Sequence, residues 1–102
     1  KVNIIKIKNM TKAEIVTKVS NNLGLDKNEV LATFENLMSE IKDSLYNGEN
    51  VYLRGFGSFV VKQRAEKTGR NISKNVTIRI PAHQIPAFKP AKVFVDGVKK
   101  NN

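Results

Sequence analysis

The stretch RAEKTGRNISKNVTIRIP, residues 64–81, decides the fold that we expect for this chain. Strand-like runs lie at residues 58–61 (SFVV) and 76–80 (VTIRI), and Ile72 is the single apolar residue within 67–75. This pattern predicts a long β-hairpin whose far end leaves the body of the protein. Ten extended residues reach about 30 Å, whereas a compact domain of this length has a radius of gyration of about 13 Å. An arm so long, basic and poor in core residues is typical of a clamp for nucleic acid.

The excess positive charge lies in the half of the chain that carries this arm. The whole sequence has a formal net charge of +9. Residues 1–53 contain seven Lys and seven Asp or Glu, whereas residues 54–102 contain eleven Lys or Arg against only Glu66 and Asp96. A charge excess confined to one half predicts a polyanionic partner for that half.

The length of 102 residues predicts one domain with a modest core. An arm committed to a partner leaves still less surface to bury, so dimerisation is a natural way to complete the core. We expect the domain at residues 10–102, with the arm at about 60–81 and an N-terminal extension at 1–9. The absence of cysteine fits a reducing compartment. No apolar run approaches the roughly 20 residues that cross a bilayer, so no membrane association is expected.

Two helices are predicted before the first strand. Residues 11–14 (TKAE) and 26–29 (DKNE) each read as a capping box, which marks the start of a helix. Apolar residues then recur at helical spacing until Gly24 ends the first helix and Gly48 follows the second. The second helix has about 20 residues. The short turn between the helices predicts an αα-hairpin.

A short strand at 51–53 and a sharp corner at 55–57, around a buried Phe56, follow the helices. A last short helix is expected at about 91–100. Continuous helix and central strand are excluded where prolines recur, at Pro81, Pro86 and Pro90. The predicted fold class is therefore α+β. A helical base, made of the αα-hairpin and the short C-terminal helix, carries a three-stranded antiparallel sheet that extends into the β-hairpin arm.

Two other functions are disfavoured by the residues themselves. The two helices suggest a helix-turn-helix reader, but residues 27–46 carry two Lys against four acids, and phosphates would repel a recognition helix of that sign. Catalysis has little support, because His83 is the only histidine and cysteine is absent. We interpret His83 as a surface or hydrogen-bonded residue. No enzyme activity, metal or cofactor is expected.

The basic residues carry the functional argument. Lys62 and Arg64 share one strand face, as do Thr77 and Arg79 on the returning strand, but the register between the two strands is left open. A single lysine is most simply a solvated charge, and a charged edge also protects a hairpin from aggregation. Neither explains a whole set of cations with almost no balancing acids.

Ile72 has two interpretations. An apolar residue at the tip of a polar arm resembles the wedges that minor-groove proteins insert between base pairs to kink the duplex. Alternatively, Ile72 folds back onto the loop at residues 70–75. The residues alone leave both open.

Four motifs together resemble the bacterial HU and integration host factor family of DNA-bending proteins. They are MTKAEIV (10–16), RGFGSF (54–59), TGRN (68–71) and IPAHQIPAFKPAK (80–92), and the resemblance runs from Met10 to about Lys100. It implies an intertwined homodimer or heterodimer with a helical base, a saddle-shaped sheet and two β-arms that wrap the minor groove of double-stranded DNA. Phe56, Phe59 and Phe88 would be core residues.

The resemblance also implies a set of DNA-binding residues. Arg70 and Asn71 would lie at the arm tip in the minor groove, and Lys89 and Lys92 would contact the backbone beside the saddle. The full set of expected DNA contacts is Lys62, Arg64, Lys67, Arg70, Asn71, Ile72, Lys74, Arg79, Lys89 and Lys92. One departure is notable: the family usually has proline as its wedge where this sequence has Ile72, so the bend angle is open.

We therefore expect a dimeric, non-enzymatic, histone-like protein of the bacterial cytoplasm and nucleoid. It would bind the minor groove with low sequence specificity and bend or compact DNA, either as a homodimer or with a paralogous subunit. One alternative is a site-preferring bender in recombination or transcription, like integration host factor. Another is an adaptor that binds a protein through its helical base.

Overall fold

The computed structural model describes residues 8–71, 73 and 76–100. Its elements, in chain order, are α1 (Lys12–Leu23), α2 (Lys27–Tyr46), β1 (Val51–Leu53), β2 (Gly57–Arg64), β3 (Lys67–Asn71), β4 (Val76–Ile80), β5 (His83–Pro90) and α3 (Lys92–Lys99). These elements confirm the predicted α+β class. Of the expected N-terminal extension, residues 1–7 lie outside the described part of the chain.

Side-chain caps fix the starts of α1 and α2. The Glu14 N–H donates to the Thr11 hydroxyl at 3.2 Å, and the Thr11 N–H donates to the Glu14 carboxylate at 3.3 Å. This is the predicted capping box. At α2, the Asp26 carboxylate accepts hydrogen bonds from two N–H groups of the first turn. Gly24 ends α1 with a φ of 68°, a left-handed conformation that costs glycine little. The predicted αα-hairpin is confirmed.

The three-stranded sheet has the order β1–β2–β5, with antiparallel neighbours. β2 pairs with β5 along its whole length, from Gly57 opposite Pro90 to Arg64 opposite His83. The proline pattern excluded a central strand in this region but did not identify the edge strand β5. β5 lies at an edge of the sheet, where Pro86 and Pro90 are tolerated because an edge strand does not need every N–H. The exclusion of a central strand is confirmed.

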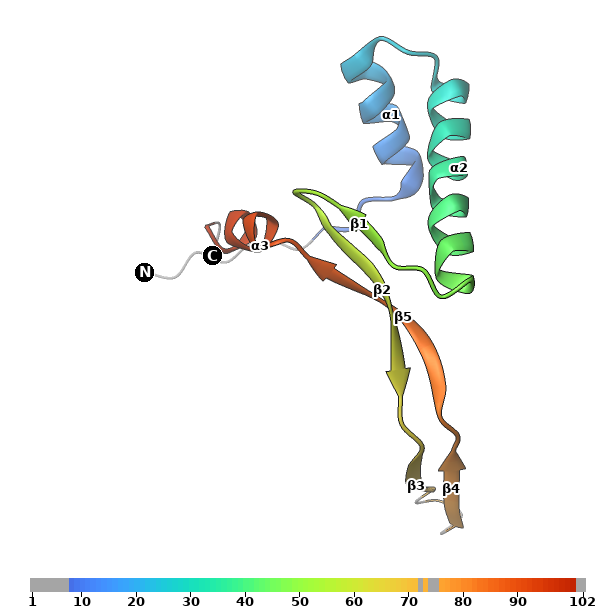
Figure 1. Ribbon diagram of the computed structural model, residues 1–102. Helices are drawn as coiled ribbons and strands as arrows, with labels where there is room; N and C mark the ends of the chain where they lie inside the picture. The colour runs from blue at the N-terminus through green and yellow to red at the C-terminus, as the bar shows by residue number, and fades with distance from the viewer. Residues whose placement is uncertain (1–7, 72, 74–75, 101–102) are drawn as a thin grey trace.

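The ribbon formed by β2 and β5 continues into the smaller ribbon of β3 and β4. Figure 1 shows this second ribbon projecting away from α1 and α2, while α3 lies at the other end of β5. The predicted arm is therefore present. Among the described residues, it places Lys67, Arg70 and Arg79 on the ribbon that projects away from α1 and α2.

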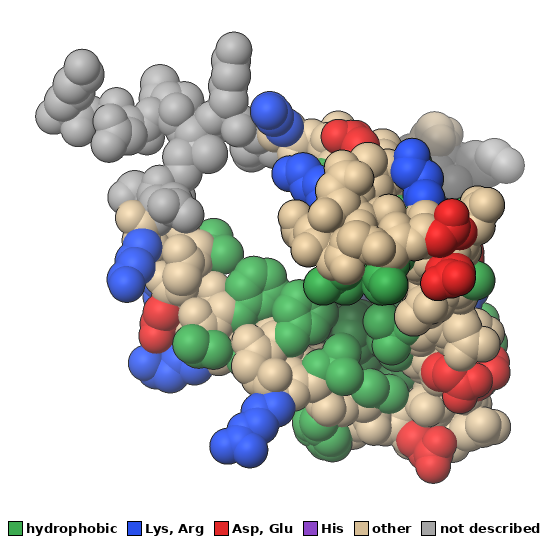
Figure 2. Space-filling view, turned by 90° about the horizontal axis from the view of Figure 1, so that it is seen from above, with side chains coloured by type: hydrophobic (Ala, Val, Ile, Leu, Met, Phe, Trp, Pro, Cys, Tyr) green, Lys and Arg blue, Asp and Glu red, His purple; other side chains and the backbone are tan. Residues whose placement is uncertain are grey.

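The single chain buries few of its hydrophobic side chains. Its radius of gyration is 19.3 Å, well above the roughly 13 Å of a compact domain of this length. Among the described residues, Val16 and Val30 are the only buried hydrophobic ones. Figure 2 shows hydrophobic side chains gathered in one hollowed area, with acidic side chains along one side of the molecule.

In the single chain the predicted burial is wrong for Phe56 and Phe88, whereas Phe59 is half-buried. Phe56 is 47% exposed and Phe88 is 38% exposed. Their rings nevertheless contact each other, with centroids 5.2 Å apart, and Phe56 stacks on Phe94 at 5.4 Å. The cluster is thus assembled, but one chain supplies no layer of residues to cover it.

Candidate nucleic-acid interface

One face of the β2–β5 ribbon is basic. Side chains alternate between the faces of a strand, and the register places Arg64 opposite His83 and Lys62 opposite Ile85. Lys89, opposite Ser58, lies on this same face. The four titratable residues of this face are all exposed. Three of them, Lys62, Arg64 and Lys89, are predicted DNA contacts, and the register that the sequence left open places them on one face, with Lys89 toward the other end of the ribbon.

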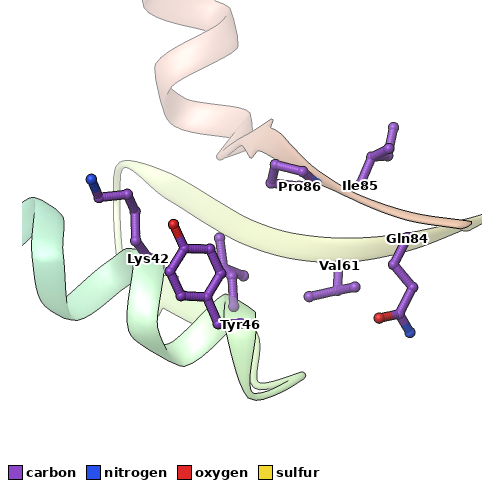
Figure 3. Close-up of a pocket in the computed structure, with 7 residues that line it drawn as sticks. Lys42, Tyr46, Val61, Gln84, Ile85 and Pro86 are labelled. Carbon is purple, nitrogen blue, oxygen red and sulfur yellow. The ribbon is translucent and has the colours of Figure 1, made fainter.

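The opposite face of the ribbon packs toward α2. Phe59 and Phe88, which are paired in the register, have ring centroids 4.9 Å apart on this face. In Figure 3, Tyr46 of α2 lies beside the ribbon, and Val61 and Gln84 leave the ribbon on the side away from Ile85. A pocket of about 410 Å³ separates the end of α2 from the strands there. Because the helical base occupies this face, the basic face is the one left for a partner.

The arm also has two different faces. Its register places Thr68 opposite Arg79 and Arg70 opposite Thr77, so both arginines lie on one face. The other face of β4 carries Val76, Ile78 and Ile80, each at least 40% exposed. The sequence had paired Thr77 with Arg79 on one face, and the structure adds Arg70 to them. The sequence analysis did not identify the apolar stripe of Val76, Ile78 and Ile80, although the alternating sequence VTIRI contains it.

The two ribbons are separated by a joint. Neither ladder includes Ala65 and Glu66 on one side or Pro81 and Ala82 on the other. The His83 ring fixes this segment, because its Nδ1 lies 2.9 Å from the Pro81 carbonyl oxygen. This hydrogen bond confirms the interpretation of His83 as a surface, hydrogen-bonded residue.

A hollow of about 670 Å³ opens beside the joint. Its charged lining consists of Arg64, Lys67, His83 and Glu66, and Ile80 and Ile85 supply its apolar part. Glu66 is the single acid of this lining, and the other three side chains are basic. The hollow therefore extends the basic surface from the sheet toward the arm.

Two of the predicted contacts already have acidic partners. Arg79 donates to Glu66 from Nε at 3.0 Å and from an NH2 group at 3.2 Å, so the pair is bidentate. Lys92 donates to Asp96 at 3.2 Å across one turn of α3. Glu66 and Asp96 are the only two acids of residues 54–102. Both acids of the basic half thus pair with a predicted DNA contact.

Lys89 and Lys92 lie near the end of the ribbon that is opposite the arm. The Ala91 N–H donates to the Phe56 carbonyl oxygen at 2.9 Å, which ties the start of α3 to the corner before β2. Lys89 and Lys92 flank this tie, and the Lys92 side chain is 90% exposed. The predicted contacts therefore occupy both ends of the ribbon rather than one patch.

Some predicted contacts lie beyond what the structure describes. Ile72 and Lys74 lie outside the described residues, and Asn71 is described only through its backbone at the end of β3. In the described part of the chain, no group of three His, Cys, Asp or Glu residues is placed to hold a metal ion. No helix within those same ranges is long and apolar enough to cross a membrane.

Known proteins are similar to this chain in sequence and in fold. The family described as bacterial DNA-binding protein matches residues 10–99.

The chain belongs to this family. It is 43% identical over 93 residues to the DNA-binding protein HU of Thermus thermophilus, covering 91% of this chain and 96% of that one. It is 42% identical over 90 residues to the DNA-binding protein HU 2 of Bacillus phage SPbeta, covering 88% and 98%. The Anabaena HU–DNA cocrystal structure superposes with a TM-score of 0.83 at 34% identity, covering 87% and 97%. The resemblance drawn from the four motifs is confirmed.

Proposed function

We propose that this protein is an architectural DNA-binding protein that binds the minor groove of duplex DNA with low sequence specificity, and that it bends and compacts the DNA. The observation that carries the proposal is the register that places Lys62, Arg64 and Lys89 along the free face of a ribbon whose extension bears Arg70 and Arg79. An extended, positively charged surface is complementary to the negatively charged phosphate backbone of a duplex. The family relationship supports the same conclusion.

The arm supplies the groove contacts in this proposal. Arg70 and Asn71 enter the minor groove at the tip, where Ile72 inserts between base pairs. Lys62, Arg64, Lys67, Lys74 and Arg79 neutralise phosphates along the arm and its root, and Lys89 and Lys92 hold the flanking backbone. Ile72 and Lys74 lie outside the described residues, so the sequence alone supports their part in the proposal.

In this proposal each chain contributes one DNA-binding domain, residues 10–102, and two chains form the dimer that binds DNA. The exposed hydrophobic surface supports this part of the proposal. A hollow of about 870 Å³ between α2 and the sheet has an apolar part formed by Met38, Ile41, Leu45, Phe59 and Pro86, and its polar part includes Glu35 and Lys42. Another of about 240 Å³ between α1 and α2 is lined mostly by apolar side chains. A second copy would cover these areas and complete the core that one chain lacks.

Affinity in this mechanism comes mainly from counterion release, since phosphate contacts carry little sequence information. Any site preference comes from the deformability and groove width of the duplex, because the minor groove distinguishes little beyond A·T from G·C. The proposed activity is binding and bending alone, without a reaction or a cofactor. Its place is the bacterial nucleoid or a similar genome.

Fluorescence energy transfer across an end-labelled random duplex tests the proposal. The pure protein should shorten the end-to-end distance at low salt, and the effect should weaken as salt is raised. A scrambled duplex should respond about equally. If the duplex stays straight at saturation, or if only one sequence binds, the proposed function is wrong.

A further inference from the structure

The ion pair between Glu66 and Arg79 lies at the root of the arm. Glu66 belongs to the joint between the two ribbons, and Arg79 lies on β4 opposite Thr68. The two hydrogen bonds, of 3.0 and 3.2 Å, occupy the guanidinium from Nε and from one NH2 group. Both side chains face solvent, with exposures of 75% for Arg79 and 51% for Glu66. The pair is therefore open to exchange with an anion from solution.

A carboxylate and a phosphate bind a guanidinium in the same way. Each presents two oxygen atoms to the planar fork of N–H donors, so the two anions compete for one site. Arg79 lies on the arm face that also carries Arg70, which is the cationic face of the arm. In the free protein the donors of Arg79 that would meet a phosphate are held by Glu66.

We propose that Glu66 is an internal competitor of DNA: it occupies the guanidinium of Arg79 in the free protein, and a backbone phosphate displaces it on binding. The inference rests on the proposed function and deepens it, because it names a residue that sets affinity without contacting DNA. Arg79 then differs from Arg70, because Arg79 contacts a DNA phosphate only by exchanging the Glu66 carboxylate for it.

The strength of the pair fits such an exchange. Exposed ion pairs shift an equilibrium by about 1.4- to 5-fold, and a bidentate pair lies toward the upper end. A competitor of that strength biases the free arm, and a polyanion still overcomes it. Because a homodimer carries two such pairs, removing the competitor should tighten DNA binding by about 2- to 25-fold at low salt.

The same contact has a purely structural interpretation, in which it braces the root of the arm. That interpretation predicts the opposite sign. Glu66→Gln would loosen the arm, add disorder to be lost on binding, and weaken affinity. The direction of the change in affinity therefore separates the two.

A double-mutant cycle measured by fluorescence anisotropy on a labelled duplex provides the test. The variants are Glu66→Gln, Arg79→Ala and the double variant, with Glu40→Gln as the control that removes the same charge from the helical base. We expect Glu66→Gln to tighten binding within the range above, and to give a clearly smaller gain in the Arg79→Ala background. The control should change affinity by less than about 2-fold, as expected for an exposed charge far from the arm. Weaker or unchanged binding by Glu66→Gln, or an equal gain in both backgrounds, would overturn the inference.

A second readout needs no DNA. The Nε–Hε resonance of Arg79 should show slowed solvent exchange in the free wild-type protein and faster exchange in Glu66→Ala. Equal exchange in the two proteins would also overturn the inference. If wild type binds no duplex, the proposed function fails while this readout still reports the pair. If wild type binds but the cycle shows no coupling, only the role of Glu66 fails.

Discussion

Gly57 lies so close to Phe88 that a side-chain carbon on it would fall 2.6 Å from the phenyl ring. The same carbon would also lie 2.6 Å from the Lys89 carbonyl oxygen. A real Cβ atom does not tolerate contacts this short, and one of the two neighbours is backbone. The absence of a side chain at Gly57 is therefore what allows the first residue of β2 to pair with Pro90 at the end of β5.

Gly57→Ala should destabilise the protein by about 1–3 kcal/mol, as overpacking of a tight contact does. Urea denaturation at fixed protein concentration measures this. Gly97→Ala is the matched control, since its Cβ would meet no atom within 4 Å. In the helix α3 that change should stabilise by about 0.5–1 kcal/mol. Equal stability of Gly57→Ala and wild type would show that the ribbon shifts freely at this point.

The protein should sediment as a dimer at micromolar concentration, and its thermal midpoint should rise with protein concentration. The reason is that Val16 and Val30 are the only hydrophobic residues buried within the described part of a single chain. Association is then part of the folding equilibrium. A folded monomer at micromolar concentration would contradict the proposed assembly.

Binding should weaken steeply with salt, and Arg70→Ala should flatten that dependence. Each lost phosphate contact removes roughly 0.9 from the log–log slope, so a homodimer that loses two contacts should change by about 1.8. Lys62→Ala should act in the same direction from the sheet. Lys27→Ala, on the helical base, is the control and should leave the slope unchanged. An affinity that does not vary with salt would refute the electrostatic account.

Ile72→Ala should reduce the bend angle markedly while affecting affinity for straight DNA much less. A wedge unstacks a base step at a cost of a few kcal/mol, which the extra contacts of the bent duplex offset. Ile72→Pro should preserve or increase the bend, because proline is the more rigid wedge. Energy transfer on an end-labelled duplex measures both. Bending like wild type by Ile72→Ala, or a free dimer that melts several degrees lower, would make Ile72 a loop-packing residue.

Local signals in the sequence predicted the helices well. The Thr11 and Asp26 caps and Gly24 each act within a few residues, so the bounds of α1 and α2 follow from the chain itself. β4 was also predicted at residues 76–80, because its alternation is a local property. Interactions of this range do not depend on the rest of the fold.

The missed features depend on partners that are distant in sequence. β5 is a strand because β2 supplies its hydrogen bonds, while Pro86 and Pro90 within it argue locally against one. The common face of Lys62 and Lys89 needed the register between two strands, which no local pattern contains. The pairing of Glu66 with Arg79 crosses the arm in the same way. Burial of Phe56 was predicted from its type, but one chain lacks the layer that would cover it.

The prolines of β5 have a further consequence for solubility. β5 is an edge strand, and edge strands can recruit strands from neighbouring molecules into growing aggregates. Pro86 and Pro90 carry no N–H, so the outer edge of this sheet lacks donors at two positions along its length. When many copies of the protein bind the same DNA molecule, as proposed above, their β5 edges lie close together. The same residues that obscure β5 in the sequence thus help crowded copies to stay separate rather than join into fibres.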